Sequence, residues 1–455
     1  MRRSRLPLTV VPSIVVAVAL VATTAVAGPE SPPGGAAPSG AAPVARPAGA
    51  GVPSDPTQQV AADLDLTTLV PALQDAFGER YGGYWIEPRR HRDVLNVAIV
   101  DATADDEAAV ASLTGGDPRV RTHAVTHGYD DLLSAQEEIA HSLDPAAGNF
   151  AVDLDVAGNS VVVQTANPDL GATQAVAEDA ARRGAAERGE RGRRPRPGRP
   201  GPRAGEAPGT GAPTDLATAV RVEPNAAIEV APDLGATAAA GPSRNDFPPY
   251  EAGLSIRVVS GGWLLQCTTG FLYWNPYGFF GSTAGHCGYP NDGVLIGPHI
   301  VDVIRANGYH GYPWVMADTS LVSLSARGWP GWPEIDTGNY GHRGVTGKYR
   351  NAQIGSGLRL CFEGMYADTG WCGWVVRANT WTCCDAAGHA YYYSCIDAPS
   401  GPGDSGGPVY FPVDPGRAIA AGTVSSSVTI NGVRMMCFST VESIEYVLGS
   451  VLVTW

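Results

Sequence analysis

The chain has 455 residues and a formal net charge of −14, with 31 Lys and Arg against 45 Asp and Glu. This length allows two or three domains, and the acidic balance argues against a general nucleic-acid binder. Charged residues make up only 17% of the chain, while Gly (57) and Pro (37) are abundant, so the composition is globular on average but uneven.

The N-terminus is typical of a secretory signal peptide. Arginines among the first five residues precede a mostly apolar stretch at 6–22, and Ala25-Val26-Ala27 has the small-x-small pattern of a cleavage site. We predict a signal peptide over 1–27 and a secreted, extracellular protein without membrane contact after cleavage. An uncleaved membrane anchor is the alternative, because the apolar stretch is rather long.

Two segments of different character follow the signal peptide. Residues 28–59 are mostly Ala, Gly and Pro, with too few large apolar side chains to form a core, so we predict disorder. Residues 60–180 contain no cysteine and combine helical and strand patterns, which predicts a small α+β domain. The expected elements are helices at 64–77 (interrupted or started near Pro71), 105–113 and 129–143, a strand at 94–100, and a hairpin of 150–154 with 160–163.

The segment 181–245 is rich in Arg, Gly and Pro in its first half and in Ala and Pro in its second. This composition predicts a solvated, protease-sensitive linker that contains the maturation region. An RNA-binding or anion-binding arm is the alternative reading of the arginines, and it is disfavoured because no aromatic residue is interleaved for base stacking.

From 246 to 455 the sequence predicts an all-β region. Short apolar runs are separated by Gly and Pro, as in a sandwich or a barrel. The expected strands include 255–259, 264–271, 299–304 and 418–424, and a helical pattern appears only at 441–451.

The most informative segment is Gly403-Asp404-Ser405-Gly406-Gly407-Pro408-Val409. A serine hydroxyl is a poor nucleophile unless a base takes its proton and backbone N–H groups stabilise the oxyanion. Candidates for the partners lie upstream, in Thr283-Ala284-Gly285-His286-Cys287 and Ala317-Asp318-Thr319-Ser320-Leu321-Val322. The chain order His, Asp, Ser is one of three known triad arrangements.

In these three motifs the C-terminal part resembles the chymotrypsin-like serine endopeptidases, most of all the secreted bacterial streptogrisins and alpha-lytic protease. The resemblance implies a trypsin-like fold of two six-stranded antiparallel barrels for 246–455. It implies Ser405 as nucleophile, His286 as general base and Asp318 as orienting carboxylate. The N–H groups of Gly403 and Ser405 would form the oxyanion hole.

Asp318 has rivals for the third position of the triad. Asp302, Asp336 and Asp368 are further acidic residues of the same region. Asp318 is preferred because a small-then-apolar run fit for a buried strand follows it, whereas Asp302 comes only 16 residues after His286.

The resemblance also points to substrate-binding residues. Val424, Ser425 and Ser427 belong to the expected edge strand that pairs with substrate backbone, and Pro399 and Ser400 line the expected primary pocket. None of these side chains is charged, which predicts a preference for an apolar or small P1 residue. The alternative is a basic-residue-specific protease, because the segment from Cys395 to Ser405 is longer than usual and could bring Asp397 into the pocket.

All eight cysteines lie between Cys267 and Cys437, and an even, confined set in an exported chain predicts disulfides. The resemblance implies the pairs Cys267–Cys287, Cys361–Cys372 and Cys395–Cys437. Cys383 and Cys384 remain. They could form a strained vicinal bridge or stay as thiols, and zinc is a weaker option because no Cys-x-x-Cys pair accompanies them.

The stretch from Phe77 to Ile86 resembles the propeptide of the alpha-lytic protease group, which implies that 60–180 is a folding aid and inhibitor. We therefore expect a monomeric zymogen of a secreted serine endopeptidase that acts on polypeptides, with no metal or cofactor. His123 and His127 have the spacing of helical metal ligands but lack a following Glu. Two other classes remain as alternatives: a catalytically silent peptide-binding homologue, and an Arg-rich adhesive protein that uses the protease domain as a scaffold.

Overall fold

The computed structural model describes residues 60–89, 93–192, 215–225, 228–232, 249–296, 299–308, 314–324, 330–338, 341–366, 370–385, 388–430 and 432–455. The predicted signal peptide, the predicted disordered segment 28–59 and residues 193–214 of the predicted linker lie outside this part of the chain. In the described part, no helix is both long enough and apolar enough to cross a membrane.

An α+β domain comes first, and its first half is a three-stranded sheet with helices. The order of elements is α1 (Val60–Asp63), α2 (Leu66–Phe77), η2 (Gly78–Arg80), β1 (Tyr81–Glu87), β2 (Val94–Val100), α3 (Ala104–Leu113) and β3 (Val120–Val125). β1 and β2 pair antiparallel, and β2 and β3 pair parallel. Thr103 begins α3 with a reciprocal capping box to Asp106, which satisfies N-terminal donors of the helix. Pro71 lies inside α2.

The second half of this domain is a hairpin covered by two helices. Its elements are α4 (Tyr129–Ser142), η3 (Pro145–Ala147), β4 (Phe150–Asp155), β5 (Ser160–Thr165), α5 (Leu170–Gly192), η4 (Leu216–Ala219) and β6 (Val220–Pro224). The helices and strands share a buried core that includes Leu132, Ile139, Val161 and Ala177. The predicted hairpin turns at Asn159, whose φ of 48° is a left-handed conformation that asparagine tolerates.

The predicted linker 181–245 needs a correction, because parts of it are folded. α5 continues to Gly192, and β6 pairs parallel with β5. The composition favoured a linker because of its arginines, glycines and prolines. However, Ala180 and Ala181 are fully buried, so the apolar face of α5 extends past the start of the arginine-rich segment.

The chain from residue 229 onward is almost entirely β, and its part from residue 249 onward is called the all-β region below. Its strands are β7 (Glu229–Pro232), β8 (Tyr250–Ala252), β9 (Ser255–Ser260), β10 (Trp263–Thr268), β11 (Leu272–Asn275), β12 (Gly278–Thr283), β13 (Gly293–Ile296), β14 (His299–Asn307), β15 (Trp314–Val315), β16 (Ser320–Ser323), β17 (Gly331–Asp336), β18 (His342–Lys348), β19 (Arg359–Phe362), β20 (Trp371–Cys383), β21 (Ala390–Ile396), β22 (Pro408–Asp414), β23 (Arg417–Ile430), β24 (Val433–Thr440) and β25 (Val451–Leu452). Its short helices are η5 (Gly285–Cys287), η7 (Asn351–Gln353) and α6 (Val441–Leu448). α6 ends before the predicted 451, because Gly449 adopts a left-handed C-cap conformation with φ 56°.

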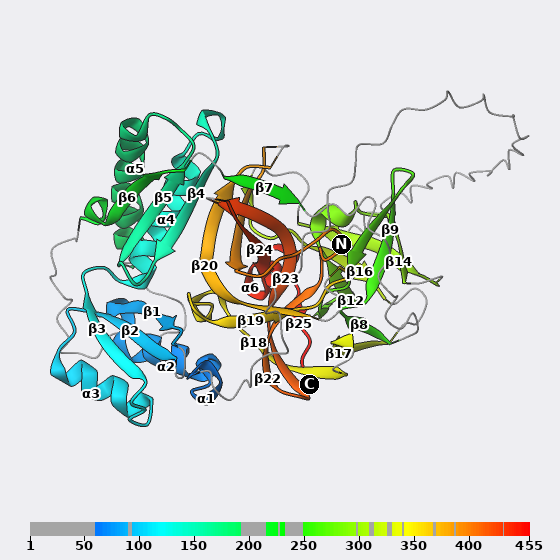
Figure 1. The fold of residues 1–455 in the computed structure, drawn as a ribbon, viewed down its shortest axis with the longest axis horizontal. Helices are drawn as coiled ribbons and strands as arrows, with labels where there is room; N and C mark the ends of the chain where they lie inside the picture. Colours follow the sequence, from blue (N-terminus) through cyan, green and yellow to red (C-terminus); the bar gives the residue numbers. More distant parts are fainter. Residues whose placement is uncertain are drawn as a thin grey trace, which may run out of the picture. The chain divides into compact units, whose positions relative to one another are not determined.

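These strands form two large sheets (Figure 1). The first is antiparallel, in the order β10-β9-β13-β14-β16-β12-β11-β25, and buries Ile256, Val258, Ile304 and Val322. The second is built around β19 to β24 and buries side chains such as Phe362. The predicted fold class, an all-β region of two barrels preceded by a small α+β domain, agrees with this architecture.

The second sheet is larger than one six-stranded barrel, since strands from earlier in the chain join it. β4 of the α+β domain pairs antiparallel with β20, so the domain's hairpin and the barrel form one continuous sheet. β7 pairs antiparallel with β23. The segment before residue 249 is therefore bound to the all-β region by backbone hydrogen bonds at two separate edges.

Candidate active site

His286 lies on η5, directly after β12 of the first sheet, and is buried. Its backbone N–H donates to Oδ1 of Asp318 at 2.9 Å, which fixes the main chain of the turn. The disulfide between Cys267 and Cys287 ties this turn to the end of β10. The imidazole is thus held at the edge of the first sheet by a covalent link on one side and a carboxylate on the other.

Asp318 lies two residues before β16 and is 2% exposed. Its Oδ2 accepts from Nδ1 of His286 and from the hydroxyl of Ser425, both at 2.7 Å. Burial opposes the charged form, but the electrostatic attraction of His286 and the hydrogen bonds from His286 and Ser425 outweigh it. The pKa of Asp318 therefore lies below its ordinary value. The residue remains ionised while it orients the ring.

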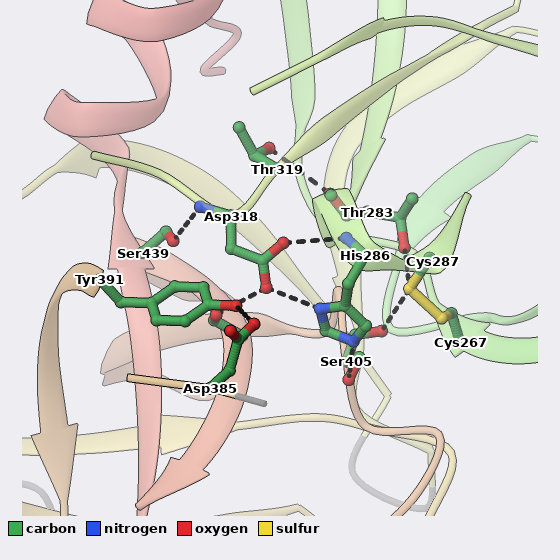
Figure 2. A network of polar contacts seen from close by, with 12 residues as sticks. Cys267, Thr283, His286, Cys287, Asp318, Thr319, Asp385, Tyr391, Ser405 and Ser439 are labelled. Atoms are coloured by element: carbon green, nitrogen blue, oxygen red, sulfur yellow. Dashed lines mark hydrogen bonds and ion pairs between the residues drawn. A yellow bond between two sulfur atoms is a disulfide. The ribbon is translucent and has the colours of Figure 1, made fainter. Parts of the chain in front are cut away.

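Ser405 lies in the loop before β22 of the second sheet, with its Oγ 2.9 Å from Nε2 of His286 (Figure 2). The next residue, Gly406, has φ +91°, and a Cβ there would collide with the main chain of Thr268. Glycine is therefore required beside the serine to make the turn. The structure brings together all three residues proposed from the sequence, from both sheets.

The loop before Ser405 is held by residues whose role the sequence motifs did not indicate. Gly403 has φ +99°, and its carbonyl oxygen accepts from the hydroxyl of Thr268 at 2.7 Å. The fully buried carboxylate of Asp404 accepts from the backbone N–H groups of Gly401 and Tyr366, at 2.9 and 2.7 Å. These bonds fix the peptide planes around the proposed oxyanion hole.

Asp404 could have been noticed in the sequence, because a charged residue between Gly403 and Ser405 needs buried partners. The contact of Thr268 with Gly403 could not be predicted from a motif, because Thr268 lies at the end of a strand 135 residues before Gly403.

The predicted substrate-binding residues lie on two segments. Val424, Ser425 and Ser427 are buried on β23, and Ser400 is buried in the loop that leads to Ser405, while Pro399 is exposed. Asp397, the basis of the alternative specificity, is exposed, and its Oδ1 accepts from the backbone N–H of Trp374 on β20 at 2.5 Å. This hydrogen bond holds the Asp397 carboxylate against the neighbouring strand, β20.

The described rivals of Asp318 have other partners. Asp302 lies on β14 within 3.7 Å of Arg305, and Asp336 on β17 accepts from the backbone N–H of Gly338. Asp368 lies outside the described residues.

The three disulfides implied by the family resemblance are present, between Cys267 and Cys287, Cys361 and Cys372, and Cys395 and Cys437. The last pair joins β21 to β24, beside the part of β23 that contains the predicted substrate-binding residues. Cys383 and Cys384 are bonded to each other at the end of β20, and the peptide between them is cis.

One group of possible metal ligands occurs in the described residues, formed by Glu251, Glu334 and His342. Nδ1 of His342 lies 2.8 Å from Oε2 of Glu251, so two members of the group already contact each other directly. In the α+β domain, Nε2 of His123 lies 2.8 Å from Oδ1 of Asn96. His127 is buried, and burial lowers its pKa, so it stays neutral near pH 7. No metal is assigned to either place.

Comparisons with known proteins give a likeness in fold. No family model matches the sequence. No curated protein matches it either. Similar solved structures include protease A of Thermobifida fusca (22% identity, TM-score 0.36, 45% of this chain and 98% of that chain). Another is a Cellulomonas bogoriensis chymotrypsin (20% identity, TM-score 0.36, 45% of this chain and 98% of that chain). A third is an alpha-lytic protease homologue (18% identity, TM-score 0.36, 45% of this chain and 100% of that chain).

Each of these three likenesses spans 45% of this chain and concerns the fold alone. The functional assignment depends instead on the distances within this chain. A hydroxyl, an imidazole and a buried carboxylate lie in continuous hydrogen-bond contact, an arrangement that can activate the hydroxyl as a nucleophile.

Proposed function

We propose that this protein is a secreted serine endopeptidase made as a zymogen. The observation that carries the proposal is the unbroken chain from Asp318 Oδ2 through the His286 ring to Ser405 Oγ, with contacts of 2.7 and 2.9 Å. These distances lie within the range needed for proton transfer between a nucleophile and its base.

The geometry supports an acyl-enzyme mechanism. Nε2 of His286 takes the hydroxyl proton as Ser405 Oγ bonds to the carbonyl carbon of the peptide, and Asp318 stabilises the resulting imidazolium. The N–H groups of Gly403 and Ser405 would donate to the oxyanion, an interaction worth ~2.7–4 kcal/mol per donor in other enzymes. His286 then gives its proton to the leaving amine. Water repeats the sequence on the acyl-enzyme and releases the acid.

The substrate backbone would pair with β23. This strand already accepts an antiparallel partner in β7, with Ser426 opposite Pro232 and Ser427 opposite Ala231. An extended polypeptide gains affinity from such backbone pairing with little demand on its sequence, so pockets then select side chains. Because Ser425 hydrogen-bonds Asp318, this edge leads directly to the triad.

We infer an apolar or small P1 preference. The candidate pocket residues Ser400, Val424 and Ser427 carry no charge, and the carboxylate of Asp397 is bound to the backbone of β20. A positively charged P1 side chain would be desolvated in such a pocket without a counter-charge, which is unfavourable.

The zymogen proposal is supported by contacts between the α+β domain and the all-β region. Beyond the β4–β20 pairing, Nε2 of Gln136 donates to the carbonyl of Asn379 at 2.6 Å, and the hydroxyl of Tyr84 donates to the carbonyl of Gln353 at 2.6 Å. β7 lies on the substrate-pairing edge. A domain bound in this way would both block substrate and act as a template for a slowly folding β-barrel.

The test is digestion of a peptide library by the protein secreted from cells that express the full chain, followed by N-terminal sequencing of the protein. We expect cleavage after apolar or small residues and a mature N-terminus between β7 and β8. The Ser405→Ala chain, secreted in folded form, is the matched control. Absence of cleavage by folded, processed protein would favour the catalytically silent peptide-binding homologue. Cleavage after Arg or Lys would favour the alternative in which Asp397 binds a basic P1 side chain.

A further inference from the structure

The residue just before β7, Ile228, is buried in an apolar cluster. Ile228 is 5% exposed and belongs to an apolar cluster that is built mainly from the all-β region. Apart from Ala151 of β4, its other members are Val315 on β15, Tyr391, Tyr393 and Cys395 on β21, Val428 and Ile430 on β23, and Met435 and Cys437 on β24. Tyr391 and Tyr393 stack with ring centroids 5.4 Å apart.

The strand register relates this cluster to the catalytic serine. β7 runs antiparallel to β23, so its chain direction leads from Ile228 toward Ser425 and the triad. Along this edge Ala231 lies opposite Ser427, and Ile228 is three residues further upstream. If the substrate residue opposite Ser425 is P1, the residue opposite Ser427 is P3, and a residue in the place of Ile228 is P6.

We propose that in the mature protease this cluster is a distal subsite, S6, that binds an apolar side chain of an extended polypeptide. The inference rests on the proposed endopeptidase function and specifies its substrate class. The occupant is identified by the chain itself, since Ile228 fills the cluster while the following residues occupy the substrate-pairing edge.

Maturation explains why the subsite becomes available. Removal of the segment before residue 249 takes away Ala151 and Ile228, while all other members of the cluster remain with the protease. An apolar surface beside an open strand edge favours binding of another apolar side chain in the same register. Asn149 donates to the carbonyl of Ile228 at 2.9 Å, and this contribution of the α+β domain is lost at the same time.

The test uses the secreted, processed protein and the ten-residue peptide Glu-Pro-Asn-Ala-Ala-Ile-Glu-Val-Ala-Pro, which corresponds to 223–232 and ends before P1. A second peptide carries Ile228→Ala. A third exchanges Ala227 and Ile228, which keeps the composition but turns isoleucine to the opposite face of the strand. Binding is measured by fluorescence anisotropy, and inhibition is measured against a chromogenic tripeptide substrate.

We expect the second and third peptides to bind about tenfold more weakly than the first, the loss expected for an unburied aliphatic side chain. Equal binding by all three would overturn the subsite. If the protein hydrolyses the tripeptide but binds the three peptides equally, the subsite proposal is wrong and the protease proposal stands. If the protein binds the three peptides with different affinities but hydrolyses no substrate, the subsite proposal stands and the protease proposal is wrong.

A second measurement tests the proposal if the secreted protein still contains β7. Hydrogen exchange at those amides of 426–429 that point toward β7, and not toward β24, is compared in the full chain and its Ile228→Asp variant, with Glu223→Gln, an exposed residue of β6, as control. We expect exchange at least tenfold faster for the Ile228 variant only. Unchanged protection would show that Ile228 does not anchor the strand and would overturn the proposal.

Discussion

The hydroxyl of Ser425 donates to Oδ2 of Asp318 at 2.7 Å, and the same oxygen accepts from the His286 ring. Ser425 also belongs to the strand that pairs with β7. One residue therefore connects the edge of β23, where we propose that substrate pairs, to the carboxylate beside His286. This contact explains how the second sheet can fix a carboxylate that belongs to the first.

Ser425→Ala removes one donor from a buried carboxylate and leaves the main chain of β23 in place. A hydrogen bond to a charged group is worth about 1.5–3 kcal/mol, so we expect kcat to fall by at least about tenfold. KM for a short peptide substrate should change by less than about twofold, because backbone pairing is retained. Steady-state kinetics check this, with Ser425→Thr as the variant that keeps a hydroxyl. An unchanged kcat would show that the bond has no catalytic value.

Thr268→Val tests the support of the oxyanion loop. The Thr268 hydroxyl donates to the carbonyl of Gly403 and accepts from the backbone N–H of Met365. Without it the Gly403–Asp404 peptide can turn, and an accompanying rotation about the backbone of Gly403, a residue with φ +99°, would move the adjacent Gly403 N–H away from the oxyanion. We expect kcat to fall about tenfold with little change in KM, and Thr268→Ser to recover most of the loss. Equal losses in both variants would point to packing instead.

The pKa of Asp318 gives a pH dependence with a defined sign. Because this pKa is lowered in the folded protein, the residue contributes stability that is complete above the ordinary Asp value of about 3.9 and is lost as pH falls toward the folded-state value. We expect the free energy of unfolding of wild type to decline more steeply below about pH 4 than that of Asp318→Asn. Denaturant titrations from pH 2.5 to 6 check this. Parallel curves would contradict the lowered pKa.

Asp153 and Arg377 form an ion pair between the α+β domain and the all-β region, with only 17% and 11% of their side chains exposed. Asp153→Ala removes the charge partner of a part-buried guanidinium, so the cost should lie between that of a surface pair, about 1 kcal/mol, and that of a fully buried one, about 3–5 kcal/mol. We expect a loss of this size in the free energy of unfolding of the uncleavable Ser405→Ala chain.

The control for this prediction is the exposed pair of Asp155 and Arg221. Asp155→Asn should cost at most about 1 kcal/mol, as surface pairs do. Similar losses for both substitutions would mean that the Asp153–Arg377 pair contributes no more to stability than an exposed pair does.

The sequence was sufficient to predict that Ser405, His286 and Asp318 lie together, and it indicated several of the strands. Gly-Asp-Ser-Gly-Gly, Ala-Gly-His-Cys and Asp-Thr-Ser-Leu-Val each combine a reactive side chain with the backbone turns or buried strand that it needs, so local patterns carry the information. The helices α3 and α4 were predicted within a residue or two. The apolar residues of α4 recur with helical spacing, and α3 is rich in alanine and begins with a Thr103 capping box.

The contacts between distant segments could not be predicted in this way. The pairing of β7 with β23 joins residues about 200 positions apart, and strand partners are not visible in the spacing of a single strand. The same is true of Thr268, whose hydroxyl acts on Gly403. The extent of α5 was missed because alanines can form a buried helical face as well as a flexible linker.

The most direct test of the account is reaction of the folded, secreted protein with a fluorophosphonate, followed by peptide mapping. If His286 and Asp318 activate the hydroxyl, one adduct should form on Ser405, and His286→Ala should slow its formation by at least about a thousandfold. A folded, processed protein with no adduct at Ser405, or an adduct that forms equally fast without His286, would contradict the proposed catalytic site.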